Sequence, residues 1–155
     1  MNDKPRVAHI FIAPEKGAPM QELQEVLAIK GRGLNGDRHA SWWKEGRREI
    51  TLIAAEAIEA VNRECGAGFL PFDTRRNIVI AGISPDELND LAGKKFRIGS
   101  VVVEGTVLCV PCTGPSKTSG KKDFRKRFQN RGGLCVKILQ SDFIEVGDEL
   151  VAIES

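Results

Sequence analysis

The sequence of 155 residues predicts a mainly β barrel built from short strands, with two or three short helices. The first observation behind this is a series of short apolar runs, several rich in Val and Ile, that are separated by turn residues. The second is the composition, since 16 Gly and 7 Pro suit many tight turns. The third is that few segments show helical periodicity. A chain of this length most simply forms one domain, so we expect residues 1–155 to be a single unit.

Eight segments are expected to be strands, because each is a short run of apolar or β-branched residues bounded by turn residues. They are Arg6–Ala13, Glu25–Lys30, Glu49–Ile53, Ile78–Ala81, Lys95–Ile98, Ser100–Leu108, Leu134–Leu139 and Glu149–Ile153. The first two are expected to pair with each other across the connection that holds Gly17 and Pro19.

Two segments carry clear helix signals. In Ala54–Cys65 the apolar residues recur on one face, and Gly66 follows as a stop. This pattern interprets Cys65 as a core residue. A second, shorter helix is expected over Ser84–Leu91, with Ser84 as its cap and Pro85 at its first position.

The one basic run is Lys121–Arg131, and two interpretations of it remain open. Phe124 and Phe128 are four residues apart, which favours a short helix with its aromatic side chains inward and its charges in solvent. Otherwise the run forms an electropositive rim over an anionic ligand. The whole chain, with 23 Lys and Arg against 21 Asp and Glu, is too evenly charged to indicate nucleic-acid binding.

The N-terminal apolar stretch is shorter than a membrane span and lacks the layout of a signal peptide. The four cysteines are also too sparse for a disulfide scaffold. We therefore expect a cytoplasmic protein without a membrane anchor.

Two of the cysteines lie in the segment V-L-C-V-P-C-T-G-P-S-K-T-S-G, residues 107–120. Cys109 stands between apolar neighbours, so core packing is its expected role. Cys112 follows Pro111 and opens a stretch of Gly, Pro, Ser, Thr and Lys that we interpret as a polar loop, where a thiol would be presented to solvent. A redox or metal role for the C-x-x-C pair is the alternative.

Two polar segments could hold an anion. Residues 31–40 contain three glycines within six residues, together with Arg32, Arg38 and His39, and they follow Lys30 directly. Bare amides and positive charges therefore come together there. A solvated turn in which Asp37 pairs with an arginine is the alternative. In the second segment, Arg75, Arg76 and Asn77 stand at the entrance of a strand, where guanidinium groups can grip an anion or pair with Asp73.

These segments together resemble the MOSC domain, the C-terminal module of molybdenum cofactor sulfurases, which also occurs as small stand-alone bacterial proteins. The similarity covers most of the chain and depends on the order and spacing of its motifs. They are G-L-N-G-D-R-H-A at 33–40, R-R-E-I-T-L-I at 47–53, R-R-N-I-V-I at 75–80, L-A-G-K-K-F-R-I-G at 91–99, P-C at 111–112, and the closing G-G-L-C-V-K-I-L and V-G-D-E-L.

The resemblance implies a closed β-barrel of the MOSC, pyruvate-kinase-barrel-like type that handles the molybdenum cofactor (molybdopterin) or its sulfur. In members that bind the cofactor a cysteine ligates molybdenum, and Cys112 matches that position. The remaining matches imply cofactor contacts. They are Arg75 and Asn77 for the pterin or its phosphate, Gly36, Asp37 and Arg38 in the Gly-Asp-Arg loop, and, more loosely, Lys30 and Arg32 for phosphate.

The resemblance also bears on partners. Sulfurases carry a pyridoxal-phosphate domain before this module, and a chain of this length has no room for one. Sulfur would then come from a donor such as a separate cysteine desulfurase. The expected function is molybdopterin binding, sulfur carriage on Cys112 as a persulfide, or both. The alternatives are a cofactor-dependent reductase of N-hydroxylated compounds that uses an outside electron-donor protein, and a nucleic-acid-binding module using residues 121–131.

Overall fold

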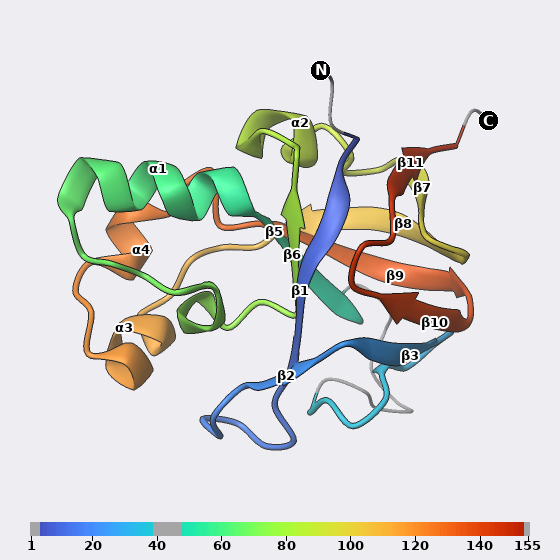
Figure 1. Cartoon of the computed structure of the whole chain (residues 1–155), viewed down its shortest axis with the longest axis horizontal. Coiled ribbons are helices and arrows are strands. Elements are labelled where there is room, and N and C mark those ends of the chain that lie inside the picture. The colour runs from blue at the N-terminus through green and yellow to red at the C-terminus, as the bar shows by residue number, and fades with distance from the viewer. Residues whose placement is uncertain (1–3, 39–47, 154–155) are drawn as a thin grey trace.

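The computed structural model describes residues 4–38 and 48–153. The predicted contributions of His39, and of Ala40 and Arg47 in the matched motifs, lie outside the described residues. A large mixed sheet runs through the centre of the molecule (Figure 1). Its eight strands follow the order β11 (Leu150–Ala152), β7 (Lys95–Ile98), β8 (Val101–Leu108), β9 (Leu134–Gln140), β5 (Ile50–Ala54), β6 (Ile78–Ala81), β1 (Arg6–Ile12) and β2 (Gln21–Leu23).

A second, smaller sheet has the order β10 (Asp142–Glu145), β3 (Glu25–Ile29) and β4 (Gly33–Leu34). All eight predicted strands are present, but the predicted pairing of the first two is wrong. The unpredicted strand β2 pairs with β1, and β3 pairs instead with β10. Val26 and Ala28 of β3 are buried by this arrangement. The apolar positions of β3 are therefore buried in a sheet whose other strand, β10, is distant in sequence.

The mainly β class is confirmed, but no sheet among the described residues closes into a barrel. Closure is nearly reached where the start of β1 meets the segment that leads into β11. There, Val7 N–H donates to Asp148 O at 2.8 Å, Gly147 N–H donates to Val7 O at 2.8 Å, and Leu150 N–H donates to Pro5 O at 2.9 Å. Gly147 adopts a positive φ of 96°, so this segment turns and forms only an isolated bridge to β1 rather than a regular ladder.

Both predicted helices with clear signals are confirmed. Helix α1 (Ala55–Cys65) crosses over between the parallel strands β5 and β6 and ends at Gly66, whose φ of 65° lies in the left-handed region. Helix α2 (Pro85–Asn89) starts with a capping box between Ser84 and Glu87.

The segment after Cys112, predicted to be a loop, instead forms helix α3 (Gly114–Ser119). Pro115 at its start and Gly120 after its end, with φ 74°, are the usual boundary residues of a helix. The 3-10 turn η1 (Pro71–Thr74) and helix α4 (Phe124–Arg127) complete the part that the structure describes. Figure 1 shows α1, α3 and α4 gathered at one side of the molecule and β3 and β10 at the other.

A cluster of three phenylalanines fixes the helical side. Phe124 and Phe128 are fully buried, as predicted, and their ring centroids are 4.4 Å apart. Phe69 meets them edge-on at 5.9 Å and 5.5 Å. Burial of each such ring stabilises the fold by roughly 1.5–3 kcal/mol, with a smaller gain from the edge-on geometry. The charges of α4 remain at the surface, which agrees with the inward-aromatic interpretation of the basic run.

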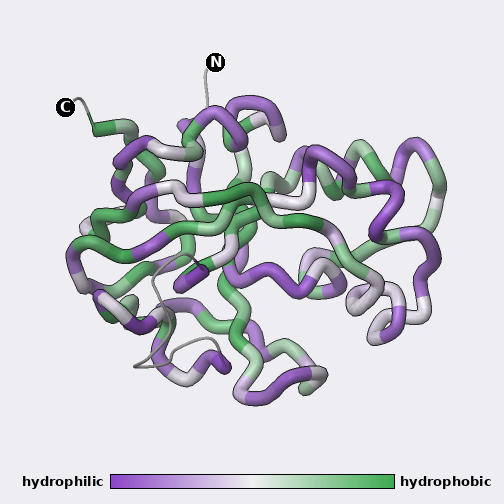
Figure 2. The backbone as a smooth tube through the Cα atoms, turned by 180° about the vertical axis from the view of Figure 1, so that it is seen from behind, coloured by the Kyte–Doolittle hydropathy of each residue, from purple (hydrophilic) through white to green (hydrophobic). Residues whose placement is uncertain are grey.

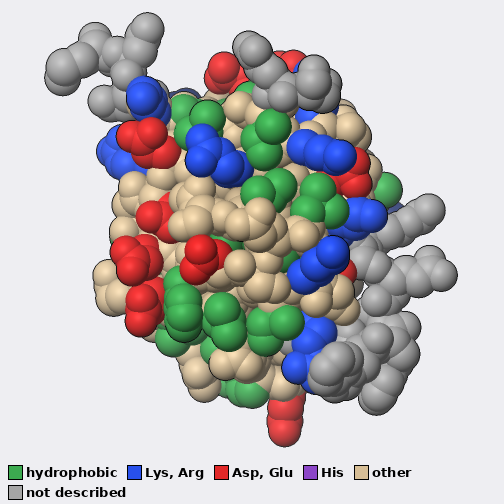
Figure 3. All heavy atoms as spheres, turned by 90° about the vertical axis from the view of Figure 1, so that its right-hand side faces the viewer, with side chains coloured by type: hydrophobic (Ala, Val, Ile, Leu, Met, Phe, Trp, Pro, Cys, Tyr) green, Lys and Arg blue, Asp and Glu red, His purple; other side chains and the backbone are tan. Residues whose placement is uncertain are grey.

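The apolar residues concentrate in the strands at the centre of the molecule, whereas the turns around them are more polar (Figure 2). The side opposite the helices carries basic and acidic side chains interspersed with apolar ones (Figure 3). Within the described part of the chain, no helix is long and apolar enough to cross a membrane.

Candidate functional site

A cavity of about 430 Å³ opens where the ends of several strands meet helix α3. Its volume is in the range of small-molecule and cofactor sites. Its wall combines the turn after β1, the residues before β5 and β6, the end of β8, part of β9, and α3. The lining residues are Lys16, Gly17, Arg38, Arg48, Thr51, Arg75, Arg76, Cys109, Val110, Cys112, Gly114, Pro115, Lys117, Thr118 and Cys135.

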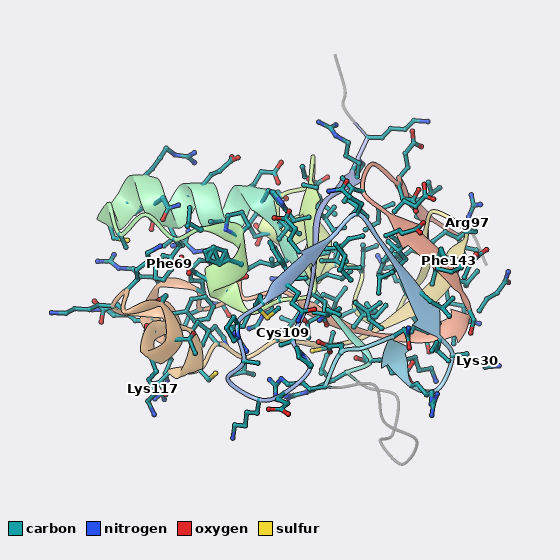
Figure 4. All side chains as sticks on the ribbon, turned by 60° about the horizontal axis from the view of Figure 1, so that its bottom comes forward. Lys30, Phe69, Arg97, Cys109, Lys117 and Phe143 are labelled. Carbon is teal, nitrogen blue, oxygen red and sulfur yellow. The ribbon has the colours of Figure 1, made fainter. Side chains whose placement is uncertain are left out.

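The lining is strongly positive. Four arginines and two lysines contribute to it, and no Asp or Glu is among its described residues. Three of the four cysteines also line it. Figure 4 shows Cys109 near the centre of the molecule and Lys117 on α3 at the helical side. The cavity is thus suited to an anion that also reacts with, or is ligated by, sulfur.

Arg75 is held by an uncommon backbone conformation and one strong contact. Its φ of 63° is left-handed, and its Nη1 donates to Ala18 O at 2.6 Å. Burial and the neighbouring charge of Arg38 lower the pKa of Arg75 from its ordinary value, and Asp37 opposes that shift. The group stays cationic because an arginine pKa starts so high. A bound anion between two neighbouring cations offsets the repulsion between their charges.

Arg76 is the second cation contributed by this turn. Its Nε donates to Gly132 O at 2.7 Å. Its Nη2 is buried and has no hydrogen-bond partner among the described residues. Buried donors are rarely left unpaired, and because Arg76 lines the cavity, a small turn of its side chain would bring this nitrogen to a ligand there.

Cys109 and Cys135 form a pair in the cavity wall, with their Sγ atoms 3.0 Å apart. Cys109 is 6% exposed and Cys135 is 1% exposed. A hydrogen bond from Cys109, together with the charges of Arg48 and Arg76, lowers the pKa of Cys135 to about 7. The same hydrogen bond and burial raise the pKa of Cys109 above the ordinary thiol range. The pair therefore releases its first proton readily and holds its second tightly.

Cys112 is exposed, as predicted, and stands just before α3. A Cβ placed on Gly114 would lie 3.5 Å from this Sγ, an ordinary van der Waals contact, so the start of α3 lies directly beside the thiol. Lys117 of α3 lines the same cavity. Lys121, at the start of the basic run, forms an ion pair with the buried Asp73.

Of the predicted site residues, Cys112, Arg38 and Arg75 line the cavity and the others do not. Asn77 is 2% exposed, and its Oδ1 accepts hydrogen bonds from the Thr51 N–H and hydroxyl at 3.0 and 3.1 Å, while its Nδ2 donates to Phe11 O at 3.1 Å. Asp37 is buried, and its Oδ1 accepts from Ala13 N–H at 2.9 Å.

Gly36 adopts a φ of 86° at the turn before Asp37. Lys30 and Arg32 belong to the connection after β3, and Lys30 lies on the other side of the molecule from Lys117 (Figure 4). The role of these three residues as cofactor contacts stays a prediction.

Sequence reasoning missed several cavity residues, above all Cys135 and Arg48. Cys135 reaches Cys109 because β8 and β9 pair, with Leu108 opposite Leu134 and Cys109 N–H donating to Gly133 O at 2.8 Å. The sequence places the two cysteines at the ends of predicted strands, but it does not show that these strands pair. Arg48 belongs to the matched motif R-R-E-I-T-L-I at 47–53, so the resemblance carried a signal that could have found it.

The fold and this cavity define a class of small, mainly β protein with a positively charged, thiol-lined site. Residues 33–151 match the sequence profile of the MOSC domain, which is most of the chain, and the protein therefore belongs to the MOSC domain family. This confirms the family predicted from the motifs. No curated protein sequence matches the chain.

Solved structures agree on the fold. The YuaD protein from Bacillus subtilis superposes with a TM-score of 0.82 at 16% identity, covering 96% of this chain and 94% of that one. YiiM from Geobacillus stearothermophilus gives 0.76 at 17% identity, covering 97% and 75%. YiiM from Escherichia coli gives 0.72 at 16% identity, covering 97% and 70%. At such identities the likeness concerns the fold alone.

Proposed function

We propose that this protein binds the molybdenum cofactor in the cavity with Cys112 toward the metal, or carries sulfur on Cys112 as a persulfide. The observation that carries the proposal is the lining, in which six cationic side chains and three thiols surround one cofactor-sized space. Membership of the MOSC family, a group associated with molybdenum cofactor binding and sulfur, supports the same assignment.

The residues fit the chemistry of such a cofactor. Arg38 and Arg75 offer guanidinium donors to a phosphate, and the unpaired Nη2 of Arg76 offers one more buried donor. Cys112 supplies a soft thiolate ligand of the kind that molybdenum and sulfur-transfer centres favour. When bound, the cofactor supplies a metal centre and the sulfur attached to it.

The described residues include no group of three or more His, Cys, Asp or Glu side chains that could hold a metal ion. The metal would therefore arrive with ligands of its own, and the protein would add one thiolate. Sulfur would come from a donor such as a separate cysteine desulfurase. Reduction of N-hydroxylated compounds would in addition require an electron-donor protein.

The test is anaerobic purification from a host that makes the cofactor, followed by metal analysis and fluorescence of the oxidised pterin. Wild type should retain both metal and pterin, or carry a persulfide that maps to Cys112. Cys112→Ser should lose the persulfide or the metal coordination. Cys65→Ser is the matched control, because Cys65 lies on α1 outside the cavity lining.

Protein that is free of cofactor, refuses added molybdopterin and carries no persulfide on Cys112 would contradict the proposal. If cofactor is retained, a molybdenum-dependent reduction driven by an artificial electron donor would identify the reductase alternative.

A further inference from the structure

The dithiol pair of Cys109 and Cys135 lines the cavity but has no chemical step of its own in the proposed function, and it has the geometry of a redox site. Its Sγ atoms are 3.0 Å apart, and a disulfide requires about 2.05 Å. An approach of roughly 1 Å would thus join them. The pair stands at adjacent strand ends, because Cys109 directly follows β8 and Cys135 lies near the start of β9.

The pair can be reached by a small molecule although both residues are buried, because both line the cavity. The charges of Arg48 and Arg76 act on both thiols and favour the thiolate form. The other cations of the lining would hold a reactant that carries carboxylates. A nucleophilic thiolate, a second thiol in contact with it and an anion-binding wall are the parts that a two-electron sulfur reduction needs.

We propose that Cys109 and Cys135 are a catalytic dithiol that reduces the outer sulfur of a small anionic persulfide to hydrosulfide. In the first step the Cys135 thiolate attacks the outer sulfur of R–S–SH. The S–S bond of the persulfide breaks, R–S⁻ leaves, and the outer sulfur is now bound to Cys135 as a persulfide.

In the second step the sulfur of Cys109 attacks the Sγ of Cys135, and hydrosulfide leaves. The Cys109 proton passes to the departing R–S⁻. One persulfide, the Cys135 thiolate and the Cys109 thiol thus give R–SH, hydrosulfide and one disulfide. The outer sulfur gains the two electrons that the two thiols lose. A further cycle requires an external dithiol reductant.

The experiment uses the reduced protein under anaerobic conditions with one equivalent of glutathione persulfide as the probe. Hydrosulfide is measured with a sulfide electrode, and the disulfide is mapped by alkylation and peptide mass spectrometry. We expect about one hydrosulfide and one Cys109–Cys135 disulfide per protein. Added dithiothreitol should restore the pair to its reduced form for a second addition of the probe.

Cys109→Ser and Cys135→Ser should each lose most of the hydrosulfide release, whereas Cys65→Ser should match wild type. Since a buried hydroxyl can destabilise the core, Cys109→Ala and Cys135→Ala provide a second pair of variants, and thermal unfolding shows which of the four are folded. Release that is unchanged in the folded variants would overturn the proposal. So would a wild-type protein whose two thiols stay reduced, or one that releases hydrosulfide without forming this disulfide. The readout requires no bound cofactor, so its failure is distinguishable from failure of the proposed function.

Discussion

The two polar turns that the sequence offers as anion sites, 36–38 and 75–77, divide their residues in the same way. The first sends Arg38 to the cavity, and the second sends Arg75 and Arg76. In each, the neighbouring polar residue is buried in the backbone hydrogen-bonding network instead. Asp37 accepts from Ala13 N–H, and Asn77 ties β5 and β1 together.

The two turns differ in how tightly they are built. Asn77 makes three side-chain hydrogen bonds, and its own N–H is 3.0 Å from the hydroxyl oxygen of Thr51. Arg75 occupies a left-handed backbone conformation, which Arg38 does not. We infer that a motif residue can be essential to a site by shaping it rather than by touching the ligand. Turn 75–77 contributes more to the shape of the cavity in this way than turn 36–38 does.

The largest effect is expected from Asn77→Ala. The change would leave Thr51 N–H and Phe11 O without these bonds in a buried place, and each unpaired group costs ~1–3 kcal/mol. The free energy of unfolding, measured with denaturant, should fall by about 2–5 kcal/mol. Asn35→Ala, at an exposed position beside the other turn, should change it little. Equal stability of the two variants would contradict the structural role of Asn77.

Arg75→Ala should act on the ligand more than on the fold. Loss of a charged hydrogen bond costs roughly 1.5–3 kcal/mol, or about ten- to a hundredfold in affinity for molybdopterin. The lost contact to Ala18 O is only partly buried and should reduce stability by about 1 kcal/mol. Equilibrium titration measures the affinity, and Arg97→Ala on β7, away from the cavity, is the control. If both variants bind equally well, Arg75 is not a ligand contact.

Glycine substitutions should have opposite effects in the two turns. At position 75 the left-handed φ of 63° disfavours any residue with a Cβ, so Arg75→Gly should be more stable than Arg75→Ala by about 1 kcal/mol. At position 38 glycine only adds freedom to the unfolded chain, so Arg38→Gly should be less stable than Arg38→Ala by roughly 0.4–1 kcal/mol. Thermal or denaturant unfolding of the four variants gives both differences. If the glycine variant is the more stable one at both positions, or the less stable one at both, the two turns do not differ in backbone conformation as described.

The smallest effect is expected from Lys30→Ala. Lys30 is exposed and does not line the cavity, so affinity for molybdopterin should stay within about twofold of wild type. The titration used for Arg75 measures this. A tenfold loss would show that the ligand reaches beyond the cavity to the connection after β3, as the family resemblance first implied.

Much of the secondary structure could be predicted because its signals are local. Helix α1 follows from a periodic apolar face and the glycine after it, and β6 and β7 have the predicted boundaries. The partner of β3 could not be predicted in this way. Its alternating burial suits any strand that covers Val26 and Ala28, and β10 is more than a hundred residues away. Helix α3 was missed because its Gly, Pro, Ser and Thr residues favour turns as strongly as helix boundaries.

The site was predicted in part for the same reason. Cys112 and Arg75 belong to short motifs that a reader of the sequence can recognise. The contact between Cys109 and Cys135 depends on the register of β8 against β9, and no local pattern encodes it. Cys109, interpreted from the sequence as core, is buried as expected, but its partner and the cavity give it a chemical environment that burial alone does not reveal.

The incomplete closure between β1 and residues 147–150 has a mechanical consequence. Pro5, near the N-terminal end of the described chain, is hydrogen-bonded to Leu150, near its C-terminal end. The two segments run antiparallel there, as the bridge between Arg6 and Glu149 indicates. A force that pulls the two ends of the chain apart would therefore load these hydrogen bonds one after another, as in opening a zipper, rather than all together. The contact between the start of β1 and residues 147–150 should therefore open at low force. The strands that carry the cavity would separate only later.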